Sequence, residues 1–472
     1  MAASLRHAIG RRVTARSGAA RALSTSTNNR LAFVALGSNV GNRQQQLCAA
    51  WRSIQETLGR VVATSPLYET AAAYVEDQPS FLNAVVAVET ALPPLEALSL
   101  LKEAERDLGR QVRYRNGPRE VDLDLLYLGD ERLEEEKLTL PHPRIHERDF
   151  VLRPLRACRA QIAAGEFAMV DDALKRRFGK DYLSEDIDGE ERRVWSSLGA
   201  MTETGTKTGV MGVLNCTPDS FSDGGLHFDV DAALRSAEAM VTHGVDYLDV
   251  GGESTRPGST PPSLTEELDR VLPLVERLST TFDVPISVDT RRSEVALAAR
   301  DAGAACTNDV SGGAYDADML KTLAADDQQR GIVLMHMRGE PGTMNALASY
   351  EDVVAEVSVE LQERVRAAFE AGICPWRIVV DPGIGFAKNT EHNVALLRNL
   401  AQFKRNLGNL PMLIGASRKR FLGDLAGEAD ASRRDAATAG ACVACVPHAD
   451  VVRVHDVRTA VQALRAADAI IR

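Results

Sequence analysis

The 472-residue sequence lacks three features that would assign it to large functional classes. It has no uninterrupted run of the roughly 18 apolar residues that a membrane helix requires, which excludes an integral membrane protein. No segment matches the phosphate-binding pattern GxxxxGK(S/T), which excludes an ordinary P-loop kinase. The formal net charge of −11 indicates an acidic surface that repels phosphate backbones, so we expect no nucleic-acid partner. Any anionic ligand must therefore be bound by local clusters of Arg and Lys.

The N-terminal segment lacks acidic residues, since the first one in the chain is Glu56. The first thirty residues contain six Arg together with several Ser and Thr. This composition is typical of an organelle transit peptide, and the excess of Arg favours mitochondria over plastids. We therefore predict a transit peptide over residues 1–29 and a mitochondrial matrix location. The alternative is a basic tail without a targeting function.

Seven cysteines are scattered along the chain. An odd number spread in this way is typical of a reducing compartment, and a chain of this length can bury a large core without disulfide bonds. Cys442 and Cys445, with His448 nearby, resemble half of a metal or redox site. Without a second pair this signal is weak, and we expect both thiols on the apolar face of a helix.

Residues 30–160 alternate between strand and helix patterns. The predicted strands cover 31–37, 61–70, 81–90 and 121–128, and the predicted helices cover 47–58 and 95–108. The order strand–helix–strand–strand–helix–strand is that of a ferredoxin-like fold, a two-layer α+β sandwich. Charged and small polar residues then crowd residues 161–206, which we interpret as a linker, helical at its start and irregular near 197–209.

Eight apolar, strand-like runs follow within residues 207–472, with enough residues between them for a helix each. This repeat predicts a (β/α)8 TIM barrel. The runs cover 209–215, 245–251, 284–290, 304–310, 331–337, 377–383, 411–417 and 451–457. Each run delivers polar residues near its C-terminal end, where such barrels have their active sites. These residues are Asn215, Asp249, Asp289, Asn308, His336, Asp381, Ser417, Lys419, Arg453 and His455.

Asp122 and Asp124 alternate along the predicted strand 121–128, so both carboxylates point to one face. Two hard oxygen ligands at this spacing suit one or two Mg²⁺ ions, which hold nucleotide phosphates during in-line transfer. Guanidinium groups neutralise a transferred phosphate, and several precede the two aspartates in a Gly-containing loop. They belong to Arg110, Arg113, Arg115 and Arg119.

Six ordered motifs within residues 31–156 resemble 6-hydroxymethyl-7,8-dihydropterin pyrophosphokinase. They are GSNVGNR (37–43), YET (68–70), DQPSFLNAVV (77–86), GPREVDLDLL (117–126), LPHPR (140–144) and RDF (148–150). The resemblance implies transfer of the β,γ-pyrophosphoryl group of ATP to the pterin hydroxymethyl oxygen, with release of AMP and with Mg²⁺ on Asp122 and Asp124. It implies that the ATP phosphates or the reacting centre are contacted by Arg110, Arg119, His142 and Arg148, and that the pterin is bound by Thr70, Phe81, Asn83 and Phe150.

The chain departs from this family pattern at two places. Ala71 and Ala72 stand where Thr70 should be followed by two prolines, and Asn116 stands where an aromatic residue often precedes Gly-Pro. Because both places are loops, we expect altered loop closure rather than lost chemistry.

In the predicted barrel, Asp289, Asn308 and Asp381 can offer a ring of hydrogen-bond donors and acceptors to a planar heterocycle. Opposite them, three groups would supply positive charge to a leaving pyrophosphate, namely Lys419, Arg453 and His455. The loops after the first two strands, 215–225 and 251–260, are rich in hydroxyls and glycine, and we expect the first of them to form a mobile lid.

Eight ordered motifs across residues 207–472 are similar to dihydropteroate synthase, namely MGVLNCTPDSFSDGG, GGESTRPGS, SVDT, NDVSGG, LMHMRGEPGTM, DPGIGFAKN, GASRKRF and RVHDV. The similarity implies that the arylamine of 4-aminobenzoate attacks the pterin methylene and displaces pyrophosphate. It implies Mg²⁺ on Asn215, pterin contacts from Asp289, Asn308, Asp381 and Lys419, and pyrophosphate contacts from Arg453 and His455. The implied aminobenzoate pocket contains Phe221, Thr255, Arg256, Pro257, Phe386 and Ser417, and the family also suggests a homo-oligomer through barrel helices.

Two alternatives stay open at this point. The barrel of a pterin-dependent methyltransferase is similar, but it would lack the Ser417-Arg418-Lys419 run. A non-catalytic regulatory module with a degenerate first domain is disfavoured by the intact Asp122 and Asp124 pair. The prediction is therefore a bifunctional folate-biosynthetic enzyme whose substrates are the pterin, ATP and 4-aminobenzoate.

Overall fold

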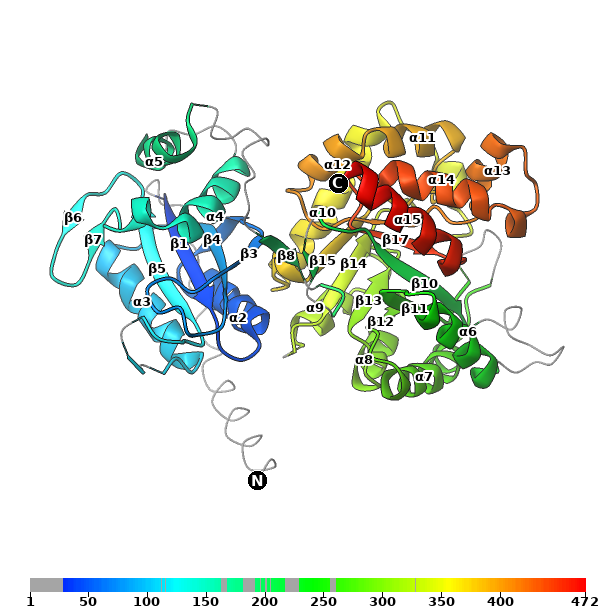
Figure 1. Cartoon of the computed structure of the whole chain (residues 1–472), viewed down its shortest axis with the longest axis horizontal. Helices are drawn as coiled ribbons and strands as arrows, with labels where there is room; N and C mark the ends of the chain where they lie inside the picture. Colours follow the sequence, from blue (N-terminus) through cyan, green and yellow to red (C-terminus); the bar gives the residue numbers. More distant parts are fainter. Residues whose placement is uncertain are drawn as a thin grey trace, which may run out of the picture.

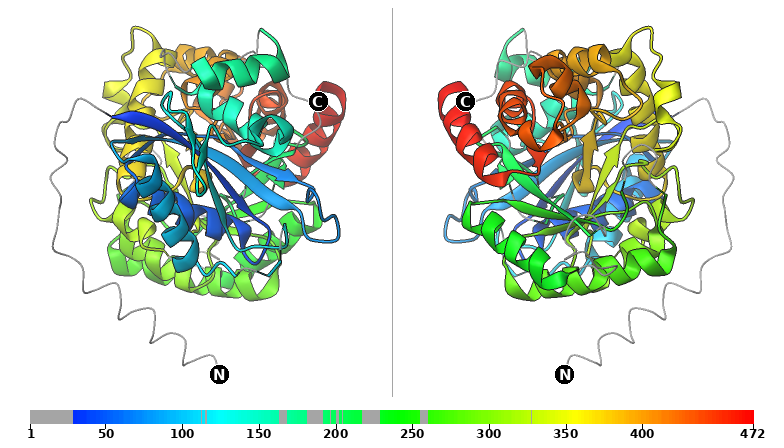
Figure 2. Two further views of the ribbon diagram at one scale, coloured as in Figure 1. Left: turned by 90° about the vertical axis from the view of Figure 1, so that its left-hand side faces the viewer. Right: turned by 90° about the vertical axis from the view of Figure 1, so that its right-hand side faces the viewer.

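The computed structural model describes residues 29–111, 113–114, 116–162, 168–180, 192–195, 197–199, 202–203, 205–216, 229–254, 260–326 and 328–472. Two domains lie end to end along the longest axis of the molecule, an α/β domain at the N-terminal side and a barrel at the C-terminal side (Figures 1 and 2). Within the described ranges, no helix is both long and apolar enough to cross a membrane.

The first domain is built on an antiparallel sheet that includes β1 (Arg30–Ser38). This strand pairs on one side with β4 (Phe81–Thr90) and on the other with β5 (Asp122–Leu128). The predicted strand 61–70 is two strands, β2 (Arg60–Thr64) and β3 (Leu67–Thr70), each paired with β4. Pro66 lies between them and lacks the N–H that a continuous ladder would need.

Helices cover both faces of this sheet, as Figure 1 shows. Alternate residues of β1 point to opposite faces, so Val34 packs against α2 (Arg43–Thr57) and α3 (Pro94–Asp107), whereas Phe33 packs against α4 (Asp149–Ala160) and α5 (Ala168–Phe178). The predicted order of strands and helices is confirmed. The prediction of only two layers is wrong, because α4 and α5, which follow the predicted elements, add a third layer.

The C-terminal domain is a closed barrel of eight parallel strands, which confirms the predicted TIM barrel. A bridge between Val380 and Met412 joins the first and last strands of the sheet order. The strands are β10 (Gly209–Asn215), β11 (Tyr247–Gly251), β12 (Ile286–Asp289), β13 (Cys306–Asp309), β14 (Gly331–Met335), β15 (Ile378–Asp381), β16 (Leu413–Ile414) and β17 (Val451–Val454). The main surrounding helices are α6 (Val230–Thr242), α7 (Leu264–Thr281), α8 (Ser293–Asp301), α9 (Met319–Ala324), α10 (Val353–Glu370), α11 (Thr390–Arg398), α12 (Leu400–Asn406), α13 (Arg420–Ala426), α14 (Asp435–Cys445) and α15 (Val457–Ile471).

Strand alternation explains why polar residues collect inside one end of the barrel. In β11, Leu248 and Val250 pack outward against the helices, whereas Tyr247 points inward into an apolar layer at the N-terminal ends of the strands. Two residues further along, Asp249 therefore also points inward, and Arg453 occupies the matching position two residues after the inward Val451 of β17. We call the C-terminal end of the barrel, where these polar residues lie, the barrel mouth.

The predicted linker contributes to both domains. Its strand β8 (Arg192–Trp195) pairs with β3 at the edge of the first sheet and with the short strand β9 (Thr202–Glu203). Trp195 packs into the apolar layer at the N-terminal end of the barrel. The prediction that the segment near 197–209 is irregular is thus partly wrong, because this segment contains β9. The first domain consequently docks on the end of the barrel opposite the barrel mouth.

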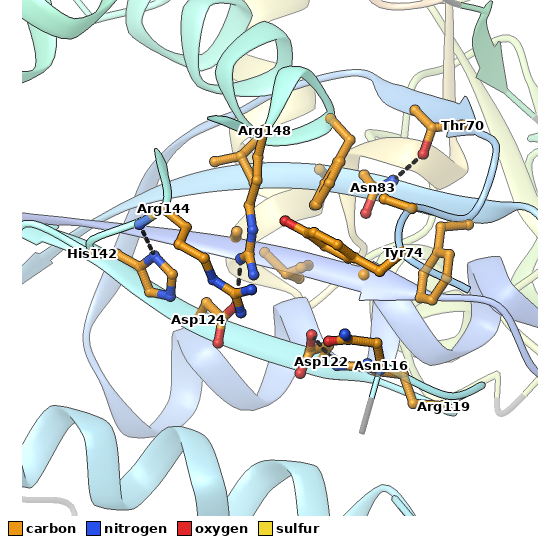
Figure 3. A pocket seen from close by; sticks show the side chains of 18 of the residues that line it. Thr70, Tyr74, Asn83, Asn116, Arg119, Asp122, Asp124, His142, Arg144 and Arg148 are labelled. Atoms are coloured by element: carbon orange, nitrogen blue, oxygen red, sulfur yellow. Dashed lines mark hydrogen bonds and ion pairs between the residues drawn. The ribbon is translucent and has the colours of Figure 1, made fainter. Parts of the chain in front are cut away.

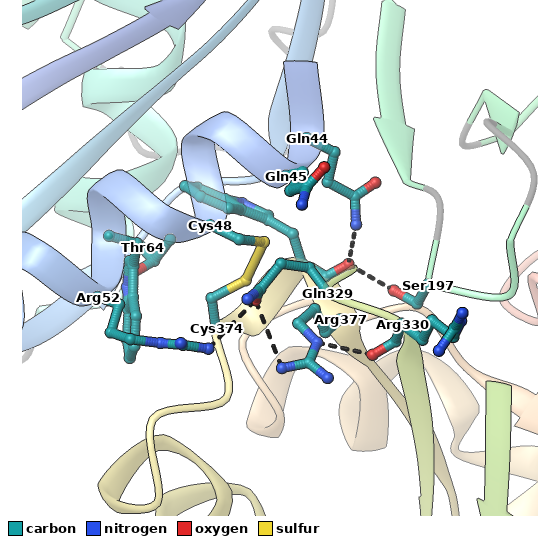
Figure 4. The surroundings of a disulfide bond; sticks show 12 residues. Gln44, Gln45, Cys48, Arg52, Thr64, Ser197, Gln329, Arg330, Cys374 and Arg377 are labelled. Carbon is teal, nitrogen blue, oxygen red and sulfur yellow. Dashed lines mark hydrogen bonds between the residues drawn. A yellow bond between two sulfur atoms is a disulfide. The ribbon is translucent and has the colours of Figure 1, made fainter. Parts of the chain in front are cut away.

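The domain interface has the character of a protein core (Figure 4). Trp376, from the loop before β15, is buried among first-domain residues, and its indole N–H donates to the carbonyl of Ser65 at 2.9 Å. Its own carbonyl accepts hydrogen bonds from Gln44 at 3.2 Å and from Ser197 at 2.7 Å. Buried polar contacts and buried apolar contacts therefore both hold the two domains to each other.

Cys48 of α2 and Cys374 of the barrel form a disulfide across this interface, with their Cα atoms 5.7 Å apart. The sequence pattern, which is typical of a reducing compartment, did not predict this pair. The two cysteines are 326 positions apart in sequence, so only the docking of the domains brings them together. The other five cysteines are free and buried.

Candidate active sites

A pocket of about 260 Å³ opens beside β5 in the first domain (Figure 3). It is lined by ten of the residues that the sequence predicted for this domain's site, which come from strands β3, β4 and β5, from the start of α4 and from the loops around them. They are Thr70, Phe81, Asn83, Arg110, Arg119, Asp122, Asp124, His142, Arg148 and Phe150. Arg113 does not line the pocket; it forms an ion pair with Glu120, 2.6 Å long. Arg115 lies outside the described residues.

The two carboxylates of β5 face this pocket together, as their alternation predicts, while Leu123 between them lies in the core. The carboxylate of Asp122 binds one guanidinium with each oxygen, Arg110 at 2.7 Å and Arg119 at 2.7 Å. The carboxylate of Asp124 lies 3.6 Å from Arg148. Both aspartate side chains keep a quarter to a third of their surface exposed, at 24% and 30%, so a ligand can reach them.

Glu105 is a site residue that the sequence reasoning missed. Its buried carboxylate accepts a hydrogen bond from the N–H of Leu123 at 2.8 Å, binds Lys102 at 2.8 Å and forms an ion pair with Arg110. It thereby ties the arginine loop to β5. A signal was present, because Glu105 falls on the apolar face of α3 with Leu101, where an acidic residue is unexpected.

Aromatic rings form the other wall of the pocket. Phe81 and Phe150 line the pocket, and Asn83 donates to the hydroxyl of Thr70 at 2.7 Å in the same lining. Tyr74, a second residue that the sequence reasoning missed, is directed into the pocket in Figure 3, with the guanidinium of Arg144 5.5 Å from its ring centroid. Its loop is the one in which the family's prolines are replaced, which was the available signal.

His142 lies beside these charges and is largely shielded from water. Its Nδ1 accepts a hydrogen bond from the backbone N–H of Arg144 at 3.3 Å. Burial lowers the pKa of His142, and the nearby carboxylate of Asp124 partly opposes that effect. The imidazole is therefore uncharged near neutral pH.

The donor set of this pocket fits Mg²⁺ bound together with a phosphate ligand. Among the described residues no group of three or more His, Cys, Asp and Glu side chains converges on a metal position. Mg²⁺, however, is commonly held by one or two carboxylates, with phosphate oxygens and water completing its shell. Asp122 and Asp124 match that pattern.

The barrel mouth brings together residues from strands far apart in sequence. Asn215, Gly251, Asp289 and Asn308 are in register across four neighbouring strands. Met335 and Asp381 are in register on the next two strands. The register therefore brings Asn215, Asp289, Asn308 and Asp381 of the predicted set to one level of the barrel, whereas His336 is directed toward Glu360 on the helix α10.

Arg453 is the centre of a buried charge network in the mouth. Its Nε donates to Asp249 at 2.6 Å and its terminal nitrogen donates to Asp289 at 2.9 Å, while Asn308 donates to the same Asp249 oxygen at 3.2 Å. Burial raises the pKa of Asp289 to about 7, although Arg453 acts in the opposite direction. Asp249, which the sequence placed at a strand end without a role, is thus the anchor of this network.

Lys419 and Asp381 form a second group in the mouth. The ammonium of Lys419 binds the carbonyl of Ile384 and lies 4.5 Å from the centroid of the Phe386 ring. Burial lowers the pKa of Lys419 to about 8 and raises the pKa of Asp381. Asp381 accepts a hydrogen bond from the N–H of Gly383 at 2.7 Å, which fixes the turn after β15.

Ser417 and His455 are hydrogen-bonded to each other in the mouth, with 3.0 Å between Oγ and Nδ1. Burial and the neighbouring Arg453 lower the pKa of His455 to about 4. The imidazole is therefore neutral at pH 7, and the expected third positive charge is absent from this site. Lys419 and Arg453 carry the positive charge.

Several predicted features lie outside the described residues. These are the lid segment after Asn215, including Phe221, and the aminobenzoate residues Thr255, Arg256 and Pro257. Asn215 itself ends β10 at the mouth. The sequence reasoning also missed the buried ion pair between Arg291 and Glu253 beside this region, in which the Arg291 guanidinium lies 4.1 Å from the ring centroid of Tyr315.

Cys442 and Cys445 lie on α14 as buried, free thiols. Their position on the buried face of a helix is as predicted. Burial raises the pKa of both thiols to about 12, so neither is a thiolate at neutral pH. These thiols therefore have the properties of packing residues.

Comparison with known proteins matches two parts of the chain to two families. Residues 33–160 match the family 7,8-dihydro-6-hydroxymethylpterin-pyrophosphokinase, and residues 211–455 match the family pterin binding enzyme. The Folate synthesis bifunctional protein of Arabidopsis thaliana is 42% identical over 465 residues, 93% of this chain and 95% of that protein. A Pisum sativum protein named Folate synthesis bifunctional protein, mitochondrial, is 41% identical over 94% of this chain and 90% of its own.

A solved HPPK-DHPS structure in complex with substrates matches 94% of this chain and all of its own, with a TM-score of 0.73 at 19% identity, which supports the two-domain fold. Neither the methyltransferase nor the regulatory alternative is supported by these similarities. The chain belongs to the bifunctional folate-synthesis enzymes, which join 6-hydroxymethyl-7,8-dihydropterin pyrophosphokinase to dihydropteroate synthase in one polypeptide.

Proposed function

We propose that Asp122 and Asp124 bind Mg²⁺ together with the phosphates of ATP in the first pocket. The observation that carries this proposal is the pair of carboxylates on one face of β5, each beside guanidinium groups. Mg²⁺ would neutralise phosphate charge as pyrophosphate is transferred. When an anionic ligand enters, Arg110 and Arg119 can exchange the carboxylate of Asp122 for phosphate oxygens, which frees that carboxylate for the metal.

The remaining residues of this pocket would bind and orient the pterin. Phe81 and Phe150 offer aromatic faces to a planar ring, while Asn83 and Thr70 offer hydrogen bonds to its edge. Arg148 can contact the transferred group, since it lies between Asp124 and Phe150. His142, being uncharged, can hydrogen-bond a phosphate oxygen without adding a positive charge that would have to be desolvated.

In the barrel we assign the pterin to Asp289, Asn308, Asp381 and Lys419, and the departing pyrophosphate to Arg453 and His455. The C–O bond to pyrophosphate breaks as the arylamine nitrogen forms its bond to the pterin methylene. The arylamine is a neutral nucleophile, so no strong general base is needed. Cationic character that develops on the pterin is stabilised by the carboxylates of Asp289 and Asp381.

The 4-aminobenzoate pocket is assigned to Thr255, Arg256, Phe386 and Ser417, and Asn215 to a Mg²⁺ ion that accompanies the pyrophosphate. Ser417 and Phe386 support this assignment by their positions, because they flank Lys419 and the hydrogen-bonded His455. Asn215 contributes one oxygen ligand, so phosphate oxygens and water would supply the rest of the metal's shell.

The direct test supplies each substrate to a protein of residues 30–472. With 6-hydroxymethyl-7,8-dihydropterin, ATP and Mg²⁺, mass spectrometry should detect AMP, and addition of 4-aminobenzoate should yield 7,8-dihydropteroate. Removal of Mg²⁺ by EDTA should abolish AMP formation, and readdition should restore it. AMP formation that persists in EDTA would refute the metal assignment.

We also propose that residues 1–29 direct the chain to the mitochondrial matrix. The support is the Arg-rich, acid-free composition together with the name of the Pisum sativum relative, which places that protein in mitochondria. A fusion of residues 1–29 to a fluorescent protein should enter isolated mitochondria, become protease-protected and lose its leader. A fusion that stays outside, or that enters plastids instead, would contradict the proposal.

Two further expectations belong to the same proposal. The first is that the two catalytic domains cover residues 30–160 and 207–472, with a linker over 161–206. The second is that the chain forms a homo-oligomer through its barrel helices. Sedimentation velocity of residues 30–472 and of residues 207–472 tests the second expectation. Equal oligomeric states would locate the contact in the barrel, whereas a monomeric full chain would refute it.

A further inference from the structure

The loop after β15 needs restraint if it is to hold its shape at the barrel mouth. It runs from Gly383 to Lys388 and includes three residues with positive φ: Gly383 at 68°, Gly385 at 82° and Ala387 at 48°. The last of these is unfavourable for a residue with a Cβ atom. This loop carries Phe386, whose ring lies against the ammonium of Lys419.

Lys388 braces this loop from inside the protein. Only 7% of Lys388 is exposed, and its ammonium donates to the carbonyl of Phe386 at 2.9 Å and to Nδ1 of His336 at 2.9 Å. A buried lysine is costly, and a methionine would fill similar space without that cost. What the lysine adds is a donor aimed at the carbonyl of Phe386.

His336 connects this lysine to a carboxylate. Its Nε2 lies 3.0 Å from Glu360 on α10. Burial, reinforced by the charge of Lys388, lowers the pKa of His336 to about 4, so the ring is neutral. A neutral ring that accepts from Lys388 at Nδ1 must donate to Glu360 from Nε2. The hydrogen bonds therefore run in one direction, from Lys388 through His336 to Glu360.

The chain of contacts closes back on the same loop. Glu360 accepts a hydrogen bond from Nε of Arg338 at 3.0 Å, and the Arg338 guanidinium lies 3.9 Å from the ring centroid of Tyr350. The hydroxyl of Tyr350 donates to the carbonyl of Ala387 at 3.0 Å. Two successive carbonyls of the loop, those of Phe386 and Ala387, are thus held from one connected network.

We propose that Lys388 is a positioning residue for the dihydropteroate synthase reaction: through the chain Glu360–His336–Lys388 it fixes the Phe386 carbonyl and so sets the Phe386 ring on the 4-aminobenzoate side of the site. This inference rests on the proposed assignment of Phe386 to that side. Lys388 touches neither substrate in this arrangement and acts through Phe386.

The test is a double-mutant cycle on KM for 4-aminobenzoate in the two-domain chain. F386A should raise this KM about tenfold through the lost wall of the pocket. K388M should raise it about five- to tenfold, because the Phe386 carbonyl loses its buried donor. If Lys388 acts through Phe386, the double variant K388M/F386A should have the KM of F386A alone. In K388M, KM for the pterin pyrophosphate should change less than twofold.

K404M is the matched control. Lys404 is also a largely buried barrel lysine, bound to Asp450 at 2.6 Å and to the carbonyl of His448 at 3.0 Å, but it lies at the end of the barrel remote from the mouth. Its replacement should leave KM for 4-aminobenzoate unchanged. Should K388M fail to fold, E360Q removes the carboxylate from a partly exposed site and should raise the same KM in the same direction.

Each outcome has a distinct meaning. An unchanged KM in K388M, or effects of K388M and F386A that multiply in the double variant, would overturn the positioning role. An unchanged KM in F386A would instead refute the proposed place of Phe386 in the aminobenzoate pocket. A rise in KM in K388M, masked in the F386A background, supports the inference.

Discussion

In the first domain the carboxylates of the site keep part of their surface in contact with water, whereas in the barrel the carboxylates of Asp249, Asp289 and Asp381 are largely buried. Asp122 and Asp124 remain 24% and 30% exposed beside three arginines, whereas Asp289 is 12% exposed and burial moves the pKa values of Asp289 and Lys419 toward neutrality. The open pocket suits a ligand as large and charged as a metal nucleotide. The largely buried carboxylates of the barrel suit a reaction in which a cationic centre develops and must be stabilised by fixed charges.

The largest expected effect is the separate loss of each activity. D122N should lower AMP formation by about 10²- to 10³-fold, because the carboxylate that would bind Mg²⁺ is gone. The same variant should convert supplied pterin pyrophosphate and 4-aminobenzoate to dihydropteroate at the wild-type rate. K419M should instead lose the formation of dihydropteroate from supplied pterin pyrophosphate and should form AMP at the wild-type rate. Loss of both activities in either variant, with the fold intact by circular dichroism, would break the comparison between two independent sites.

The pH dependence should differ between the sites. Asp289 has a pKa of about 7, so below that pH it becomes protonated and can no longer accept hydrogen bonds from the pterin as a carboxylate. Lys419 has a pKa of about 8 and loses its charge above that pH. The kcat/KM of the barrel reaction should therefore rise through pH 7 and fall above pH 8, changing about tenfold per pH unit on each limb. D289N should lack the acidic limb, and a limb that persists unchanged in D289N would count against this assignment.

The junction between the two regions should contribute stability rather than chemistry. W376A removes a ring buried in the first domain's core and its hydrogen bond to Ser65, at an expected cost of about 3–5 kcal/mol in the free energy of unfolding. Denaturant titration monitored by circular dichroism measures this cost. Both activities should persist at low temperature with saturating substrates. Equal stability of W376A and the parent would show that the interface is not core-like.

The smallest expected effect concerns Tyr74 and tests whether the first pocket is open to solvent. Tyr74 and Tyr114 are each 55% exposed, but only Tyr74 lines the pocket and faces Arg144. Y74A should raise a substrate KM of the first reaction about two- to fivefold, which corresponds to a surface cation–π contact. Y114A is the matched control, and it should change neither the KM for ATP nor the KM for the pterin. A tenfold or greater effect of Y74A would mean that the pocket closes more tightly on its ligands.

The elements that bear the chemistry were predictable because they repeat a simple pattern. Asp122 and Asp124 alternate on one strand, and each predicted barrel run has polar residues near or just beyond its C-terminal end, so their spacing placed them. Tertiary partners were not predictable in this way. Glu105 accepts from the N–H of Leu123 only after α3 packs against β5, and Cys48 meets Cys374 only after the domains dock.

The charge states of buried residues also could not be predicted from the sequence. His455 was expected to be cationic, but its pKa depends on burial and on the distance to Arg453, which no local pattern encodes. Lys388 was visible only as part of a motif, and its role depends on a histidine 52 positions away. The third helical layer of the first domain was missed because the ferredoxin-like pattern ends before α4 begins.

The most direct test of two independent sites is to mix the two inactive variants. Trp195 and the first domain cover the end of the barrel opposite its mouth, so the pyrophosphorylated pterin should pass through solution from one site to the other. D122N and K419M, each unable to form dihydropteroate from the pterin alcohol, ATP and 4-aminobenzoate, should regain that activity when combined, after a lag that shortens as D122N is increased. A mixture that stays inactive, although each protein retains its own remaining activity, would contradict independent sites linked by a released intermediate.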